Sequence, residues 1–231
     1  SMTPRTKAIM VAHTLGNPAE MDTITMIAKK HNLFLIEDVC DGLDSRYAGR
    51  MLGSFGDIST YSFYAAHHIT MGEGGALATS DTKLYLSALS IRDWGRACYC
   101  RPGEVNPDGA CGNRFGFKFE GMPLGYDHRY TYINQGFNLK PLDIQCAIGS
   151  EQLKKLGFFT EVRKRNFQMI LSALHNHQDK LILPRSLDKA NPSWFAFPIT
   201  LKRDSGLKRS EFVKYLECKG IETRMLFAGN I

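Results

Sequence analysis

Four cysteines carry the clearest chemical signal in this chain. Between Cys40 and a C-x-C pair formed by Cys98 and Cys100 there are 57 residues, and ten residues separate Cys100 from Cys111. Four thiolates suit a [2Fe–2S] cluster, because soft sulfur ligands hold iron and inorganic sulfide well. The same four could bind tetrahedral zinc or could be unconnected buried thiols, so the spacing alone leaves three interpretations open.

Composition limits the class of protein. The 231 residues carry a net charge of +6, which favours acidic partners, and no segment is typical of a nucleic-acid-binding module. Six cysteines in a chain of this size do not indicate a disulfide scaffold. No apolar run approaches the roughly 18 residues that a membrane helix needs, and no secretory leader is visible. We therefore expect a cytoplasmic protein that binds neither nucleic acid nor membrane.

The first part of the chain predicts alternating strands and helices. Residues 8–12 and 33–36 are short apolar runs typical of buried strands, and apolar positions recur with helical spacing over residues 19–31. Residues 58–64 and 76–79 predict two further strands. Strands separated by helices indicate an α/β fold, with a mostly parallel sheet covered on both faces.

Polar side chains follow two of these predicted strands. Asp38 and Cys40 come directly after one strand, and the strand over residues 58–64 delivers Ser62 and His67 to its carboxyl end. In open α/β sheets, ligands bind beyond the carboxyl ends of the strands. We therefore expect these four residues to lie at an active site.

The middle of the chain combines an irregular segment with helices. Residues 102–132 are rich in glycine, proline and aromatic side chains, which predicts a long excursion from the sheet. Pro141 is expected to start a helix that runs to about Leu156. A second helix, with Thr160 as its N-cap, is expected to run to about His177.

The pattern of predicted elements changes after residue 184. Residues 194–201 predict a strand, residues 210–219 predict a helix that ends at a glycine, and a further strand is expected from residue 221. The prediction is a partial cofactor-binding domain over residues 1–179, followed by part of a small α+β domain over residues 180–231.

Seven short motifs share their order with a known family. They are Ile36-Glu37-Asp38, Gly53-Ser54-Phe55-Gly56-Asp57, Ser62-Phe63, Gly72-Glu73-Gly74-Gly75, Gly136-Phe137-Asn138, Asp143-Ile144-Gln145 and Gly220-Ile221-Glu222-Thr223. Together they resemble the DegT/DnrJ/EryC1/StrS sugar aminotransferases of the fold-type I pyridoxal-phosphate enzymes. The resemblance covers essentially the whole chain. Family members are much longer, so it implies that the chain is a fragment that retains only part of the cofactor site.

One position separates this chain from the aminotransferases of that family. They carry a Schiff-base lysine shortly after the Ser-Phe motif, where this chain has His67. Histidine there resembles the nucleotide-sugar 3-dehydrases that use pyridoxamine phosphate. The four cysteines, the last of them in Cys111-Gly112-Asn113-Arg114-Phe115, resemble the iron–sulfur branch, the CDP-4-keto-6-deoxyglucose 3-dehydrases of lipopolysaccharide dideoxysugar biosynthesis. The segment between Cys100 and Cys111 is three residues longer here than in that branch.

The resemblance implies a particular chemistry. Histidine cannot bind the cofactor covalently, so pyridoxamine phosphate would bind without a covalent bond and its amine would condense with the C4 ketone of the sugar. A neutral imidazole at His67 would remove a proton from the cofactor methylene carbon, and the C3 hydroxyl would leave. The cluster would then supply electrons one at a time. This implies a partner reductase that carries flavin and its own iron–sulfur centre.

The resemblance also assigns roles to the neighbouring residues. Asp38 would pair with the pyridine nitrogen of the cofactor, and Asp41 would contact the cofactor ring or its 3-oxygen. Ser62 would bind the cofactor phosphate. Asn138 would reach the cofactor phosphate of a second subunit, which implies a homodimer. His68 is expected to be a structural neighbour of the site.

Two other functions stay open at this point. A cluster-free dehydratase of the same fold would use His67 and regenerate its cofactor with glutamate, and the four cysteines would then be coincidental. A non-catalytic fragment could bind zinc through its cysteines and act as a structural or dimerisation module. An aminotransferase is not expected, because a histidine replaces the lysine. A CDP-linked 4-keto-6-deoxyhexose as substrate rests on the resemblance alone.

Overall fold

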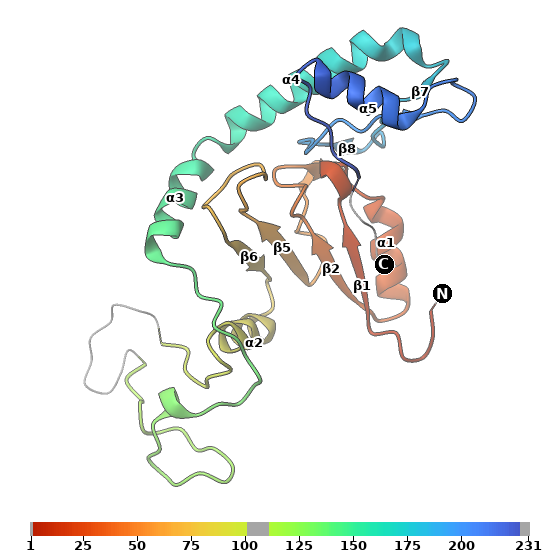
Figure 1. Cartoon of the computed structure of the whole chain (residues 1–231). Coiled ribbons are helices and arrows are strands. Elements are labelled where there is room, and N and C mark those ends of the chain that lie inside the picture. The colour runs from red at the N-terminus through yellow and green to blue at the C-terminus, as the bar shows by residue number, and fades with distance from the viewer. Residues whose placement is uncertain (1, 101–110, 227–231) are drawn as a thin grey trace.

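The computed structural model describes residues 2–100 and 111–226, and its centre is a four-stranded sheet. The strands are β1 (Ala8–Ala12), β2 (Phe34–Asp38), β5 (Ile58–Ser62) and β6 (Gly75–Ala78), in the order β1-β2-β5-β6 (Figure 1). Neighbouring strands are parallel from β1 to β5, whereas β6 runs antiparallel to β5. The prediction of an α/β fold with a mostly parallel sheet is therefore confirmed.

One helix packs on this sheet and builds the core. Helix α1 (Met21–Lys30) begins where the Glu20 side chain accepts a hydrogen bond from the Thr23 backbone N–H at 2.7 Å, and basic residues occupy its last turn. Its buried face joins residues of β2 and of the following loops in one apolar cluster. The fully buried members are Met21, Ala28, Leu35, Val39, Tyr47 and Leu52.

The second face of the sheet is covered less than the sequence predicts. All four residues of β6 are exposed among the described residues, including the large apolar side chain of Leu77. Helix α2 (Thr82–Arg92), which the sequence analysis did not predict, follows β6 directly and is capped by Asp81. Because β6 is antiparallel to β5, α2 lies at the amino ends of the three parallel strands (Figure 1).

A long irregular excursion follows α2, as predicted. Among its described residues the only helical turn is η2 (His128–Tyr130). Two isolated antiparallel bridges, Asp93 to Asn138 and Arg96 to Tyr132, close the base of the excursion. The predicted length difference between Cys100 and Cys111 falls on residues 101–110, which lie outside the described residues.

Two consecutive helices lead to the C-terminal part. They are α3 (Asp143–Leu153) and α4 (Leu156–Leu174), with the short turn η3 (His175–His177) at the end of α4. The prediction that Thr160 caps a helix is wrong, because α4 has already begun at Leu156 and Thr160 is buried inside it. Further along α4, the ring of Phe167 stacks on Trp194, with centroids 3.8 Å apart.

The C-terminal part contains short strands and one helix. Strands β7 (Leu181–Ile182) and β9 (Thr200–Leu201) pair with each other, and α5 runs over Arg209–Cys218. The predicted strand over residues 194–201 is reduced to β9, and Trp194, with a φ of +48°, lies in the irregular segment before it. The predicted strand from residue 221 is absent over 221–226, and residues 227–231 lie outside the described part.

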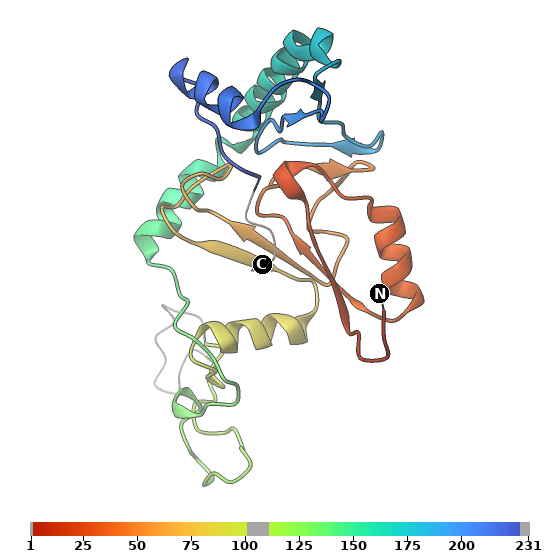
Figure 2. The ribbon, with the colours of Figure 1, turned by 45° about the vertical axis from the view of Figure 1, so that its right-hand side comes forward.

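The C-terminal part also contacts the beginning of the chain. Strand β8 (Ala190–Asn191) pairs with β3 (Arg46–Tyr47), which pairs in turn with β4 (Arg50–Met51). The residues after β8 continue over the carboxyl ends of β1 and β2, where Phe195 N donates to Leu15 O at 2.9 Å (Figure 2). No helix among the described residues is both long and apolar enough to cross a bilayer.

Candidate functional site

His67 lies in the turn that follows β5 and is held by one short hydrogen bond. Its Nδ1 atom is 2.7 Å from the carbonyl oxygen of Cys40, which follows β2. A carbonyl oxygen can only accept, so Nδ1 carries the proton in this contact. In the neutral imidazole, Nε2 is then the basic nitrogen. The backbone of the neighbouring strand end therefore fixes the tautomer that a general base needs.

Three side chains surround the imidazole of His67. Asp41 Oδ1 lies 3.8 Å from Nδ1, and the two side chains are 14% and 16% exposed, respectively. The ring of Phe195 lies 5.1 Å from the imidazole, and the ring of Tyr64 approaches edge-on at 6.3 Å. The largely buried imidazole thus has aromatic rings on two sides and a carboxylate on the third.

Asp41 is oriented by the loop that follows β1. Its Oδ2 atom accepts a hydrogen bond from Leu15 N at 3.1 Å. Gly16, with a φ of +79°, allows this close approach, because a Cβ atom there would lie 2.7 Å from the Asp41 carbonyl oxygen. Burial raises the pKa of Asp41, and the hydrogen bond from Leu15 and the charge of His67 offset this rise only in part.

Asp38 ends β2 beside the same turn. Its Oδ1 atom accepts from Cys40 N at 3.0 Å, and the residue is half-buried. The Cys40 thiol lies in the same surroundings. Burial raises the pKa of this thiol to about 12, with a further contribution from Asp38. Asp38, Cys40, Asp41 and His67 therefore form one group at the carboxyl end of the sheet, where Asp38, Cys40 and His67 were expected from their positions after the predicted strands.

Of the two other predicted cofactor residues, Ser62 lies near His67 and Asn138 does not. Ser62 is the last residue of β5, and its Oγ atom accepts from Tyr64 N at 3.3 Å, so it lies on the same turn as His67. Asn138 is exposed and forms a backbone bridge with Asp93, beyond the end of α2. Among the described residues it has no contact with the His67 group, so its predicted role in a second subunit stays a prediction.

His68 also packs near Phe195, with ring centroids 6.1 Å apart, but its imidazole belongs to a buried polar network. Its Nε2 atom lies 2.9 Å from Ser193 Oγ, which lies 2.8 Å from Ser45 Oγ. Ser45 donates its only hydroxyl proton to the carbonyl of Gly16, so Ser193 donates to Ser45 and His68 Nε2 donates to Ser193. Burial, together with Arg163, lowers the pKa of His68 to about 3, which keeps the ring neutral.

Removal of the central hydroxyl in the Ser193→Ala variant is expected to lower the free energy of unfolding by about 1–3 kcal/mol, because the buried His68 N–H loses its acceptor. Urea unfolding followed by circular dichroism measures this loss. Ser172→Ala, on the exposed side of α4, is the matched control and is expected to change stability by less than about 0.5 kcal/mol. Equal stability of the two variants would contradict the assigned network.

A second group of ligand-type side chains lies in the excursion. The Sγ atoms of Cys98 and Cys100 and one ring nitrogen of His128 all lie within 4.8 Å of one another. Cys111 Sγ lies 3.4 Å from His128 Nε2. The structure thus gathers three of the four predicted cysteines around a histidine that the sequence analysis did not select, and Cys40 belongs to the His67 group instead.

Two further residues of the His67 site were not predicted. Arg163 of α4 donates from Nη1 to the carbonyl oxygens of Trp194 and Phe195, both at 3.2 Å, and burial lowers the pKa of its guanidinium. These bonds hold the ring of Phe195 beside His67. Nothing near Phe195 in the sequence signals this contact, since it joins residues that are distant along the chain.

The family comparison matches the complete chain. The model of the DegT/DnrJ/EryC1/StrS aminotransferase family matches residues 1–231. The chain is 52% identical to the lipopolysaccharide biosynthesis protein RfbH of Salmonella typhimurium, of which it covers 52%. It is 47% identical to the dTDP-4-dehydro-2,6-dideoxy-D-glucose 3-dehydratase of Saccharopolyspora spinosa, of which it covers 49%. The chain therefore spans about half the length of the curated relatives it matches.

Solved structures show the same fold. The Escherichia coli GDP-4-keto-6-deoxy-D-mannose-3-dehydratase with bound hydrated PLP superimposes with a TM-score of 0.83 at 31% identity. The match covers 100% of this chain and 56% of the enzyme. An aminotransferase from Psychrobacter cryohalolentis superimposes with a TM-score of 0.78 at 27% identity. The chain therefore has part of the fold of these sugar aminotransferases and 3-dehydratases.

Proposed function

Since the chain belongs to the DegT/DnrJ/EryC1/StrS aminotransferase family, we propose that it carries the base of a nucleotide-sugar 3-dehydratase. The substrate would be a nucleotide-linked 4-keto-6-deoxyhexose that loses its C3 hydroxyl. The observation that carries this proposal is His67, whose Nδ1–H bond to the Cys40 carbonyl leaves Nε2 as the basic nitrogen. Two relatives named as 3-dehydratases, at 47% and 34% identity, support it.

The residues at the strand ends fit a pyridoxamine or pyridoxal phosphate cofactor. Asp38 uses one carboxylate oxygen for Cys40 N, and the other has no hydrogen-bond partner among the described residues, so it can accept from a pyridinium N–H. Ser62 offers a hydroxyl at the start of the turn that carries His67. The cofactor, when bound, supplies an amine that condenses with a ketone and a ring that takes up electrons.

Within this site each residue has a separate task. His67 Nε2 takes up and returns a proton, while Nδ1–H stays bound to the Cys40 carbonyl and keeps the ring in one orientation. Asp41, 3.8 Å from the protonated nitrogen, stabilises the imidazolium that forms when Nε2 takes up a proton. Phe195 covers one side of the ring and excludes water from it.

A more specific version of this proposal is a reductive reaction that uses a [2Fe–2S] cluster bound by four cysteines. The four cysteines do not lie together in the described chain. Cys98, Cys100 and Cys111 surround His128, whereas Cys40 lies with His67 at the other end of the sheet. A cluster-free 3-dehydratase is the second candidate, because none of the contacts that position His67 involves a cysteine of the excursion.

Turnover assays separate the two candidates. The chain would be incubated with pyridoxamine phosphate and CDP-, dTDP- or GDP-linked 4-keto-6-deoxyhexose, with and without a flavin iron–sulfur reductase and NADH, and the products analysed by mass spectrometry. Cofactor binding is measured by absorbance in the same sample, because the chain spans about half the length of its relatives.

The expected product lacks the C3 hydroxyl. Dependence on the reductase would support the reductive reaction and the partner protein. A preference for the CDP-linked sugar would support CDP as the nucleotide. Dependence on glutamate would support the cluster-free reaction. Transfer of an amino group to C4 with the C3 hydroxyl retained, in a sample that binds the cofactor, would overturn the proposal. Elution as a dimer, lost in an Asn138→Ala variant, would support the shared site.

A further inference from the structure

We propose that Cys98, Cys100, Cys111 and His128 form a mononuclear metal site of the tetrahedral zinc type, to which Cys40 contributes nothing. Three thiolates and one imidazole are a common ligand set of structural zinc sites. The site is distinct from the His67 group, and its existence is independent of the reaction proposed above. It would hold the excursion between α2 and Asn138 in one conformation.

The distances between the side chains suit one tetrahedral ion. The Sγ atom of Cys111 lies 3.4 Å from His128 Nε2, and that of Cys100 lies 3.9 Å from the same nitrogen. With zinc–sulfur bonds of about 2.3 Å and zinc–nitrogen bonds of about 2.0 Å, a tetrahedral site separates sulfur from nitrogen by about 3.5 Å. The two observed distances lie on either side of that value.

The same geometry argues against a binuclear cluster. A [2Fe–2S] cluster distributes four ligands over two irons, so any three of its ligands include at least one pair on different metals. Such a pair must be farther apart than two ligands of a single ion. Cys98, Cys100 and His128 instead place their ligand atoms all within 4.8 Å of one another, as ligands of one ion do.

His128 is buried, and an aromatic ring packs against its imidazole. The residue is 2% exposed and its ring packs on Phe117, with centroids 4.9 Å apart. Its Nδ1 atom has no hydrogen-bond partner among the described residues, so the thiols are the principal polar neighbours of a buried ring. A buried imidazole with few polar partners is stabilised by a metal ion that it binds together with the thiols.

An ion pair joins the chain segment that carries Cys111 to the segment that carries His128. Arg114, three residues after Cys111, lies 2.7 Å from the carboxylate of Asp127, which directly precedes His128. The same carboxylate caps η2 by accepting from Arg129 N at 3.0 Å. The backbone N–H of His128 also donates to the Arg114 carbonyl at 3.4 Å. These contacts bring Cys111 and His128 together without help from a metal.

The position of the site indicates a structural role. The excursion starts after α2, at the amino ends of the parallel strands, whereas His67 and Cys40 lie at their carboxyl ends (Figure 1). Five residues of strand separate the two ends, or roughly 16 Å. Cys40 is therefore too far away, within one chain, to share an ion with Cys98.

Thiol protection and metal analysis test this proposal on the unmodified chain. After reduction and reconstitution with Zn²⁺, one zinc per chain is expected, and alkylation mapped by mass spectrometry should show Cys98, Cys100 and Cys111 protected. Cys40, Cys146 and Cys218 should react as they do without zinc. Because the readout needs no substitution, it does not depend on the folding of a variant.

Variants then identify the fourth ligand. His128→Ala is expected to lower zinc affinity at least tenfold, and His128→Cys to restore it, whereas Cys40→Ser and the exposed His177→Ala should bind zinc as the parent does. Loss of zinc in Cys40→Ser, or unchanged affinity in His128→Ala, would overturn the proposal. So would anaerobic uptake of two irons and two sulfides per chain that requires Cys40. Sugar turnover enters none of these measurements.

Discussion

Replacement of His67 by asparagine is expected to lower the rate of C3 deoxygenation by a factor of about 10²–10⁴, the usual contribution of a general base. The asparagine amide can still donate to the Cys40 carbonyl as Nδ1–H does at 2.7 Å. It has no basic nitrogen at the position of Nε2. The variant thus removes proton transfer and retains the hydrogen bond that orients the side chain, and single-turnover kinetics on the keto sugar measures the loss.

Two further measurements separate a base from a structural residue. Cofactor binding by the His67→Asn variant, followed by absorbance, is expected to stay within a few-fold of the parent, because neither Asp38 nor Ser62 depends on the imidazole. His177→Asn, on the exposed turn η3, is the matched control and should retain full turnover. Loss of cofactor binding in parallel with turnover would show that His67 positions the cofactor and does not act as the base.

The sheet and the position of His67 could be predicted because their signals are local. The strands follow from short apolar runs separated by a helical pattern, and His67 stands at a fixed place after the Ser-Phe motif. Helix α2 was missed because its apolar residues do not form a single stripe along one face. Asp81, which caps that helix with two hydrogen bonds, was the available signal.

The contacts that complete the site could not be predicted in the same way. Phe195 reaches His67 because Arg163 binds the carbonyl groups of Trp194 and Phe195, and because Trp194 turns the chain with a positive φ. No residue near Phe195 in the sequence carries that information. His128 is different, since a histidine within 17 positions of Cys111 is a spacing that metal sites use. The sequence does not single out His128, because four cysteines already make up a complete ligand set.

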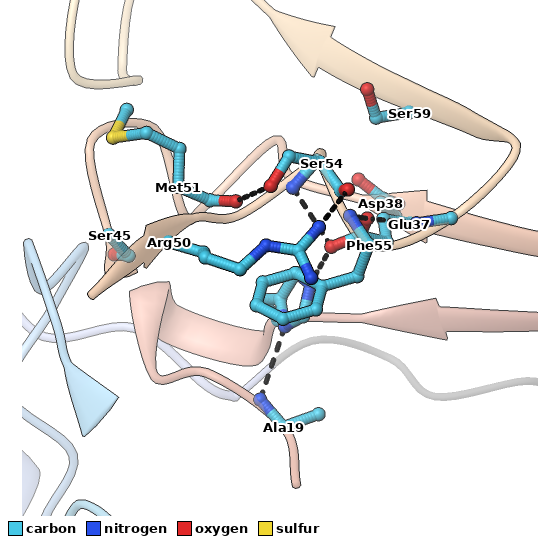
Figure 3. A network of polar contacts seen from close by, with 12 residues as sticks. Ala19, Glu37, Asp38, Ser45, Arg50, Met51, Ser54, Phe55 and Ser59 are labelled. Atoms are coloured by element: carbon cyan, nitrogen blue, oxygen red, sulfur yellow. Dashed lines mark hydrogen bonds and ion pairs between the residues drawn. The ribbon is translucent and has the colours of Figure 1, made fainter. Parts of the chain in front are cut away.

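Glu37 is the buried acid on which the loop before β5 depends. It is fully buried, and its two oxygens accept hydrogen bonds from the backbone N–H groups of Gly53, Phe55 and Gly56 at 2.7–2.8 Å (Figure 3). His13 Nε2 lies 3.3 Å away and donates to the same carboxylate, because its Nδ1 accepts from the chain at Ala19. A single carboxylate therefore fixes the strand, the loop and the residue that follows β1.

Glu37→Gln is expected to lower the free energy of unfolding by about 3 kcal/mol or more at pH 7, measured by urea unfolding. One acceptor oxygen becomes an NH₂ group that faces backbone donors, so at least one buried N–H loses its partner. Glu151→Gln, in an exposed pair with Lys154, is the matched control and should cost less than about 1 kcal/mol. A comparable small loss in both variants would contradict the assigned role of Glu37.

The same substitution should change how stability depends on pH. Burial alone would raise the pKa of Glu37, but the bonds from His13 and the three backbone groups outweigh it and lower the pKa below its ordinary value. Its stabilisation is then present above the unfolded pKa of about 4.3 and is lost as pH falls through the lower folded value. The pKa of His68 is also lowered in the folded state. Below about pH 6.5 the unfolded chain therefore binds a proton at His68 that the folded chain does not, and the free energy of unfolding falls. The parent is therefore expected to lose stability in two stages on acidification, and Glu37→Gln should lack only the stage below about pH 4.3.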